Sequence, residues 1–178
     1  MTLPGIGGTL FPSRFLADGL PRLADVAAVV ATDDAPFRSL NSWWRRVEAS
    51  CGPATGLRAI FDLAAMPLAA LLGFRARDAV FASHRVSLRL ESQGGTPAGL
   101  IVLPWATRPS RLWRDLAVEA RMLGADWCLL LAPPFLSVVD ARGCGVRRAV
   151  DFVMPDALDA RSFPVFWTLC RATSFDRD

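Results

Sequence analysis

The sequence predicts an α/β fold in which a central mixed sheet is flanked by helices. Three observations predict it. Apolar residues recur at helical spacing up to residue 72, whereas between residues 80 and 103 they alternate with polar residues or form a short run. A helical pattern returns near residue 112, and further short apolar runs follow before a last helical pattern near residue 162. This order of elements is typical of helices packed against one sheet.

The length of 178 residues suits one domain with its own core. We assign residues 1–34 to an N-terminal arm with a short helix, because Pro12 and Pro21 interrupt its apolar positions. We assign residues 35–178 to a single α/β domain, since no repeat or low-complexity tract divides them.

Two helices are predicted at the start of the domain. The first covers Pro36–Cys51 and ends at Gly52-Pro53. The second covers Leu57–Leu72; we expect a kink at Pro67 and an end at Gly73. The apolar face of the first helix consists of Leu40, Trp43, Trp44, Val47 and Cys51.

Strands and a third helix are predicted next. The alternation within Val80–Glu91 indicates a half-buried strand, and a turn at Gln93–Pro97 leads to a short apolar strand at Leu100–Leu103. Helical spacing then returns over residues 110–123, with Gly124 where a C-terminal cap belongs.

The last third of the chain predicts more strands and a closing helix. Trp127–Leu131 and Phe135–Asp140 are predicted as strands joined by a turn at Pro133-Pro134. Ala149–Met154 is predicted as a further strand, and an apolar helix begins near Ser162.

Composition excludes several kinds of enzyme. All 20 basic residues are Arg, and the chain has no Lys and a single His, His84. A P-loop lysine, a Schiff-base enzyme and a nuclease built on Glu-x-Lys are excluded, because Arg stays protonated and cannot act as a tunable amine. A single His also leaves no partner for a two-histidine metal site.

The same composition bears on compartment and partners. The cysteines lie far apart, so we predict reduced, buried thiols at Cys51, Cys128, Cys144 and Cys170. The start lacks a signal-peptide pattern and the apolar runs are shorter than the ~20 residues of a membrane helix, which predicts a cytoplasmic chain without a membrane partner. A hydrophobic share of 52% predicts either a very full core or an apolar face that a partner covers.

The short motifs supply no catalytic, cofactor or metal site. The stretch from Ala132 to Phe135 is similar to the Asn/Asp-Pro-Pro-aromatic loop of amino-methyltransferases, but Ala cannot accept a hydrogen bond from the target amine, which favours a turn. A metal-dependent nuclease would carry Glu-x-Lys on the strand at Leu100–Leu103, which has neither acid nor base. Most of the late aspartates suit turns and caps; the late aspartates are Asp140, Asp151, Asp156 and Asp159.

Arginines are the candidate binding residues, as contacts to nucleic-acid phosphates. They occur in three places, namely Arg45-Arg46 after the tryptophans, Arg111 and Arg114 on the third helix, and Arg147-Arg148 in a glycine-flanked loop. The alternative is a solvated, partly paired surface, since Asp115 lies one helical turn from Arg111.

Four stretches resemble the N-terminal nuclease-like domain of large single-chain type II restriction–modification enzymes, which are fused to an adenine-specific DNA methyltransferase. Leu10–Leu16 with Leu20-Pro21 resembles their opening arm, and Pro67–Phe74 resembles the helix end before their first strand. Leu112–Asp140 is similar to their helix, Trp-bearing strand and second strand, and Phe163–Ala172 to the closing helix.

This resemblance implies a restriction-endonuclease-like architecture, a role in phage defence, and DNA and a methyltransferase domain or subunit as partners. The sequence departs from the family in two ways. The turn at Ala132–Pro134 replaces one resembling Thr-Asn-Gly, and the catalytic Glu-x-Lys has no counterpart. We therefore expect a non-catalytic nuclease-fold domain that contacts DNA or docks a methyltransferase. The alternatives are a protein-interaction module that buries an apolar face against a partner subunit, and a stand-alone enzyme.

Overall fold

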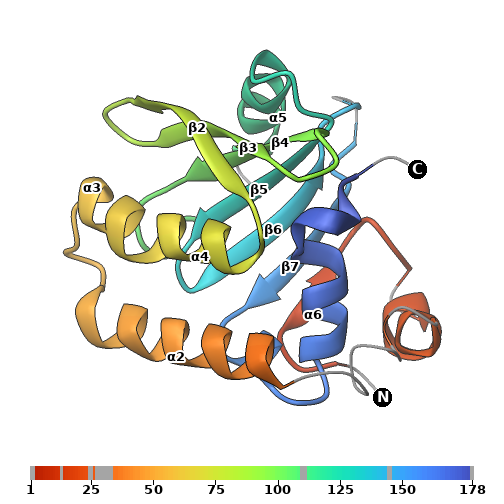
Figure 1. The fold of residues 1–178 in the computed structure, drawn as a ribbon. Helices are drawn as coiled ribbons and strands as arrows, with labels where there is room; N and C mark the ends of the chain where they lie inside the picture. Colours follow the sequence, from red (N-terminus) through yellow and green to blue (C-terminus); the bar gives the residue numbers. More distant parts are fainter. Residues whose placement is uncertain are drawn as a thin grey trace.

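The computed structural model describes residues 3–12, 14–23, 26, 34–108, 112–143 and 146–176. Within them, seven strands form one mixed sheet: β1 (Ile6–Gly8), β2 (Arg75–Phe81), β3 (Val86–Glu91), β4 (Pro97–Val102), β5 (Trp127–Ala132), β6 (Phe135–Asp140) and β7 (Ala149–Val153). Their order across the sheet is β1-β7-β6-β5-β4-β3-β2 (Figure 1). The pair β4 and β5 is parallel, and the other neighbouring pairs are antiparallel.

Helices lie on both faces of this sheet. They are α2 (Ala35–Ser50), α3 (Leu57–Ile60), α4 (Met66–Leu71), α5 (Trp113–Met122) and α6 (Phe163–Cys170). Shorter helical turns are η1 (Phe15–Gly19), η2 (Leu20–Arg22), η3 (Phe61–Ala65), η5 (Asp156–Leu158) and η6 (Ala172–Ser174). Figure 1 shows α2, α4 and α6 grouped together, with α5 apart from them at the top of the view. Helix α5 is the crossover that a parallel pair of strands requires, here between β4 and β5.

Alternate side chains of the central strands enter two separate cores. The larger core lies between the sheet and the helices α2, α4 and α6, and its strand residues include Leu88, Leu100, Leu129, Leu136 and Phe152. The smaller core lies beneath α5, and its strand residues include Ile101, Cys128, Leu130 and Val139. Strands β4 and β5 are therefore buried on both faces, which explains their continuous apolar sequence.

The α/β class, the central mixed sheet and the predicted helices are confirmed. Helix α2 lies within one residue of the prediction at both ends. Gly73 and Gly124 have φ angles of +88° and +72° and follow α4 and α5, as a left-handed helix end requires. The predicted kink at Pro67 takes the form of a π-helical turn, Phe61–Ala65, directly before α4. Pro67 has no N–H for the ordinary helical bond to Leu63, so the ladder shifts there.

The strand predicted from the alternation within Val80–Glu91 is confirmed, since residues 86 to 91 form β3. The residues before the alternation belong to other elements. Val80 and Phe81 end β2, and the chain then turns before β3, with the Ala82 N–H donating to the Arg85 carbonyl at 2.9 Å. The spacing of apolar residues does not predict β2, because β2 is an exposed edge strand with a bulge between Arg77 and Val80. Strand β1 belongs to the segment predicted as an arm, and it pairs with β7 at the opposite edge of the sheet.

Candidate functional site

Helix α2 places Arg45 and Arg46 on the surface and its apolar stripe in the larger core. Both arginines are exposed, and neither forms an ion pair with any residue that the structure describes. The buried stripe consists of Leu40, Trp43, Trp44 and Val47. The Trp43 Nε1–H donates to the Ala64 carbonyl at 3.0 Å, which fixes α2 against the next helical segment.

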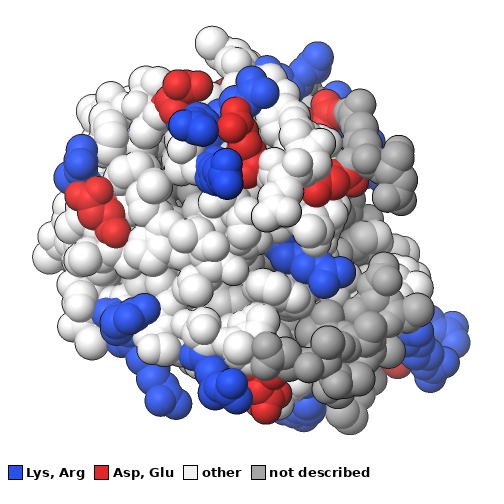
Figure 2. All heavy atoms as spheres, in the orientation of Figure 1, with Lys and Arg blue, Asp and Glu red and all other residues white. Residues whose placement is uncertain are grey.

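The exposed face of α2 is basic and rich in hydroxyl groups. Its exposed polar residues up to Arg46 are Arg38, Ser39, Ser42, Arg45 and Arg46. Glu48 is the exposed acid of this helix, and the Arg38–Asp34 ion pair is long, at 3.9 Å between exposed side chains. Figure 2 shows basic side chains gathered along the lower edge of the molecule, where α2 lies in Figure 1.

The other predicted arginines do not lie on this face. Arg114 is exposed on α5, on the opposite side of the sheet, and its guanidinium lies 5.6 Å from the centre of the Trp113 ring. Arg147 is ion-paired with Asp151, and Arg148 lies 3.9 Å from Asp140. Arg111 falls outside the described residues. The structure thus separates Arg45 and Arg46 from Arg114, with the sheet between them.

Asp140, at the end of β6, is a buried carboxylate that holds an arginine. Its side chain is 3% exposed. It accepts hydrogen bonds from the Arg142 backbone N–H at 3.1 Å, from Nε at 2.9 Å and from the terminal guanidinium nitrogen at 2.9 Å. These bonds from Arg142 lower the pKa of Asp140, against the opposing effect of burial. Arg142 also lies over the Trp127 ring, with 5.1 Å from its guanidinium carbon to the ring centre.

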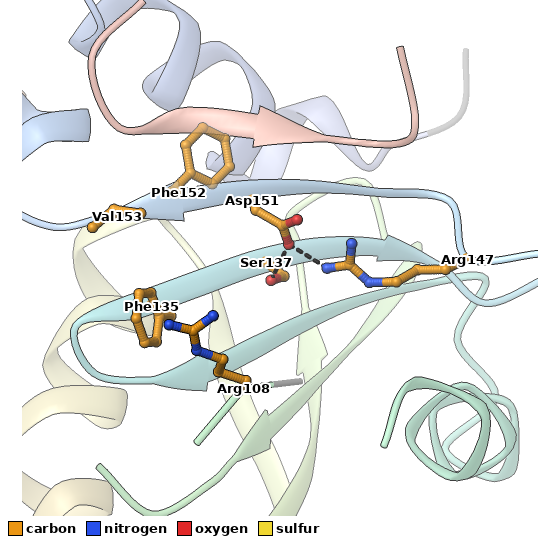
Figure 3. Close-up of a pocket in the computed structure, with 7 residues that line it drawn as sticks. All are labelled: Arg108, Phe135, Ser137, Arg147, Asp151, Phe152 and Val153. Atoms are coloured by element: carbon orange, nitrogen blue, oxygen red, sulfur yellow. Dashed lines mark hydrogen bonds and ion pairs between the residues drawn. The ribbon is translucent and has the colours of Figure 1, made fainter. Parts of the chain in front are cut away.

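A cavity of about 260 Å³ opens on the α5 side of the sheet, over β6 and β7 (Figure 3). It exists because α5 packs on β4 and β5 and leaves the outer part of this face uncovered. Its lining consists of Arg108, Phe135, Ser137, Arg147, Asp151, Phe152 and Val153. Ser137 and Asp151 are directly opposite each other in the β6–β7 register.

Three polar side chains of this cavity form one connected set. The Ser137 hydroxyl donates to Asp151 Oδ1 at 2.6 Å, and Arg147 donates to the same oxygen. Ser137 is buried, and Asp151 is half-buried. Arg108 is exposed and forms no ion pair with a described residue. Figure 3 shows Arg108 beside Phe135 at one end of the cavity and Arg147 at the other.

Sequence reasoning missed Arg108, Ser137 and Asp151 as a group. Arg108 follows β4, and the carboxyl ends of β4 and β5 meet where the Ala106 N–H donates to the Pro133 carbonyl at 2.7 Å. The end of a parallel strand before its crossover helix is a common ligand position, so this signal could have drawn attention to Arg108. Asp151 lies within β7, in the strand predicted over Ala149–Met154, and not in a turn or a cap.

The strand on which a nuclease motif would lie is β4, an interior strand of the sheet. Strand β4 runs between β3 and β5 and contains apolar residues and one glycine, Gly99. Among the described residues, no group of three or more His, Cys, Asp and Glu side chains is placed to hold a metal ion. Within the same residues, no helix is long and apolar enough to span a membrane.

Three of the cysteines are buried free thiols, as the sequence predicts: Cys51, Cys128 and Cys170. Burial raises the pKa of all three, most strongly for Cys128 and Cys170. Cys144 lies outside the described residues. The chain matches no family model, no curated protein and no solved structure. The function proposed below therefore depends on the geometry of the chain and on the sequence resemblance described above.

Proposed function

We propose that this chain is a non-catalytic, nuclease-fold domain of a DNA restriction–modification enzyme, which contacts DNA and acts as a scaffold for a methyltransferase. The exposed face of α2 carries the proposal. Arg45 and Arg46 project from it without acidic partners among the described residues. Guanidinium and hydroxyl groups are the side-chain donors that proteins use to position DNA phosphates.

The dimensions of α2 suit a DNA backbone. Arg38 and Arg46 are eight residues apart on the helix, which is about 12 Å along its axis at 1.5 Å per residue. One strand of DNA carries a phosphate about every 3.4 Å of duplex axis, so the basic face spans several successive phosphates. Two to three arginine–phosphate contacts are compatible with this length.

The non-catalytic character is supported by β4. A nuclease of the kind implied by the resemblance needs an acid and a Lys on this strand, and β4 presents apolar side chains to both cores instead. The mixed sheet, with its α5 crossover from β4 to parallel β5, supports the nuclease-like architecture. Docking to a methyltransferase rests on the sequence resemblance alone.

Salt-dependent binding to duplex DNA tests the proposal. We expect a short labelled duplex to bind in a fluorescence anisotropy titration, with affinity falling as salt rises. In the double variant R45A/R46A the slope of log affinity against log salt should decrease by about 1.8, at about 0.9 for each phosphate that the protein no longer neutralises. When the salt concentration rises from about 50 to 200 mM, the variant should therefore lose roughly twelvefold less affinity for the duplex than the wild type loses.

The matched control is R75A/R121A. It removes the same charge from exposed arginines on β2 and α5, and it should keep the wild-type slope. Binding that is absent, or that does not depend on salt, would remove the DNA role. A reduced slope in R114A with an unchanged slope in R45A/R46A would place the DNA on α5 and contradict the assignment to α2.

A second candidate function is a protein-interaction module, which the open edge of the sheet favours. Strand β2 has no partner on its outer side in the sheet that the described residues form, and Val80 and Phe81 are 62% and 44% exposed. Unpaired backbone groups beside exposed apolar side chains can accept a strand from another chain. Concentration-dependent association in sedimentation velocity, together with no affinity for DNA, would favour this function over the first.

A further inference from the structure

We propose that the cavity over β6 and β7 binds a single nucleoside monophosphate whose base carries an amino group. This site lies on the α5 side of the sheet, opposite α2, and does not depend on the DNA contact proposed above. Three features of the cavity select this ligand: its net charge, its apolar end and the acceptor at its centre.

The charge of the lining favours an anion. Two arginines and one aspartate line the cavity, which gives a net charge of +1. Asp151 is balanced by Arg147, so the positive charge that remains is that of Arg108. The guanidinium of Arg108 is exposed and has no ion pair among the described residues. A planar guanidinium matches the oxygens of a phosphate with two parallel hydrogen bonds.

The apolar end of the cavity favours a flat ring. Phe135 is half-buried, and Val153 is 37% exposed beside it, where the two residues are opposite each other in adjacent strands. Figure 3 places both at the end of the cavity where Arg108 lies. Bases stack on such aromatic surfaces, and the phosphate of the same molecule would then lie within reach of Arg108.

The centre of the cavity favours a neutral hydrogen-bond donor. Ser137 and Arg147 both donate to Oδ1 of Asp151, and Oδ2 receives no bond from a described residue. An ionised carboxylate only accepts hydrogen bonds. Since Arg147 already balances its charge, the fitting partner is an amino group on a base, whereas a carbonyl group there would set one acceptor against another.

The size of the cavity limits the ligand to one nucleotide. At about 260 Å³ it is slightly smaller than typical ligand pockets, which range from roughly 300 to 1,000 Å³. Ser137 and Asp151 hold each other and Arg147 in place before any ligand enters, so the polar part of the site is preorganised.

Matched pairs of nucleotides test the proposal by isothermal titration calorimetry on the full chain. AMP and IMP differ by the amino group of the base, as do CMP and UMP. We expect the amino member of each pair to bind about tenfold more tightly. Adenosine, which lacks the phosphate, and inorganic phosphate, which lacks the ring, should each bind at least about tenfold more weakly than AMP.

Two variants assign the contacts. R108A should weaken AMP binding by about tenfold or more and leave adenosine binding unchanged, because it removes the phosphate contact alone. D151N should reduce the preference for AMP over IMP, because it changes the acceptor proposed for the amino group. If D151N does not fold, R108A still tests the proposal. R121A, which changes an exposed arginine on α5, is the control and should bind AMP as the wild type does.

Four results would overturn the proposal. They are no heat of binding with AMP or CMP at millimolar concentration, equal affinity within both nucleotide pairs, equal affinity for AMP and inorganic phosphate, and an R108A variant that binds AMP as tightly as the wild type.

Discussion

Replacing Asp140 by Asn should destabilise the fold through the loss of a buried charge. Asp140 accepts three bonds from Arg142 with a side chain that is 3% exposed. Asn keeps one acceptor oxygen and turns an amide nitrogen toward a guanidinium donor. At least one charge-assisted bond is lost, which is worth roughly 1.5–3 kcal/mol. Arg142 is 56% exposed and water can solvate it, so we expect about 1.5–2 kcal/mol, or a fall in Tm of roughly 3–8 °C.

The pH dependence of this loss follows from the pKa of Asp140. The bonds from Arg142 lower that pKa in the folded state, so the carboxylate adds stability above its unfolded pKa of about 3.9. This contribution is lost as the pH falls through the lower, folded value. Urea unfolding of wild type and D140N at several pH values should therefore give a full difference at neutral pH and converging stabilities in acid.

A second Asp-x-Arg pair supplies the control. Asp159 accepts from the Arg161 backbone N–H at 3.0 Å and from its Nε at 3.2 Å, and these bonds lower its pKa as well. Its side chain is 43% exposed, against 3% for Asp140. D159N should therefore lose much less stability than D140N. Equal losses in the two variants, or a D140N loss that is the same in acid and at neutral pH, would refute the role of burial.

Two further predictions concern the core. Trp43→Phe should lower the free energy of unfolding by about 0.5–1.5 kcal/mol or more, because it removes the hydrogen bond to the Ala64 carbonyl. Trp44 is also buried, but its Nε1 has no hydrogen bond to a described residue, so Trp44→Phe should lower the free energy of unfolding less in the same urea assay. Cys128 and Cys170 should resist iodoacetamide in the folded protein at about pH 8, because burial raises the pKa of both thiols, and they should react after unfolding. Peptide mass spectrometry measures this, and alkylation of the native protein at the unfolded rate would contradict it.

The sequence predicts those elements whose burial requires a regular spacing of apolar residues. Helix α2 has one buried stripe, and β4 and β5 are buried on both faces, so each leaves a pattern that defines it. Strand β2 has nearly all its side chains exposed and is held by backbone pairing with β3, which needs no particular side chains. Its charged residues therefore give no strand signal, whereas the alternation of apolar and polar residues in β3 does.

The two candidate sites also differ in whether the sequence predicts them. The exposed Arg45 and Arg46 follow from the sequence, because the buried tryptophans beside them fix which side of α2 faces the solvent. The cavity does not, since it joins Arg108 to Ser137 and Asp151, which come from three separate elements. Their proximity depends on the β6–β7 register and on the space that α5 leaves uncovered, and neither is encoded by a local pattern.

The apolar surplus of the composition has a structural explanation within the chain. Helices cover one face of the sheet, and α5 covers part of the other. A strand that is buried on both faces needs apolar side chains at every position, and β4 and β5 have such sequences. Much of the surplus is buried there, so the composition by itself does not require a missing partner. Other large apolar residues are also exposed, among them Met122 and Val146, but Val80 and Phe81 on β2 lie at an open edge of the sheet. Any protein interaction of this domain should therefore be sought first along β2, on a different part of the molecule from the arginines of α2.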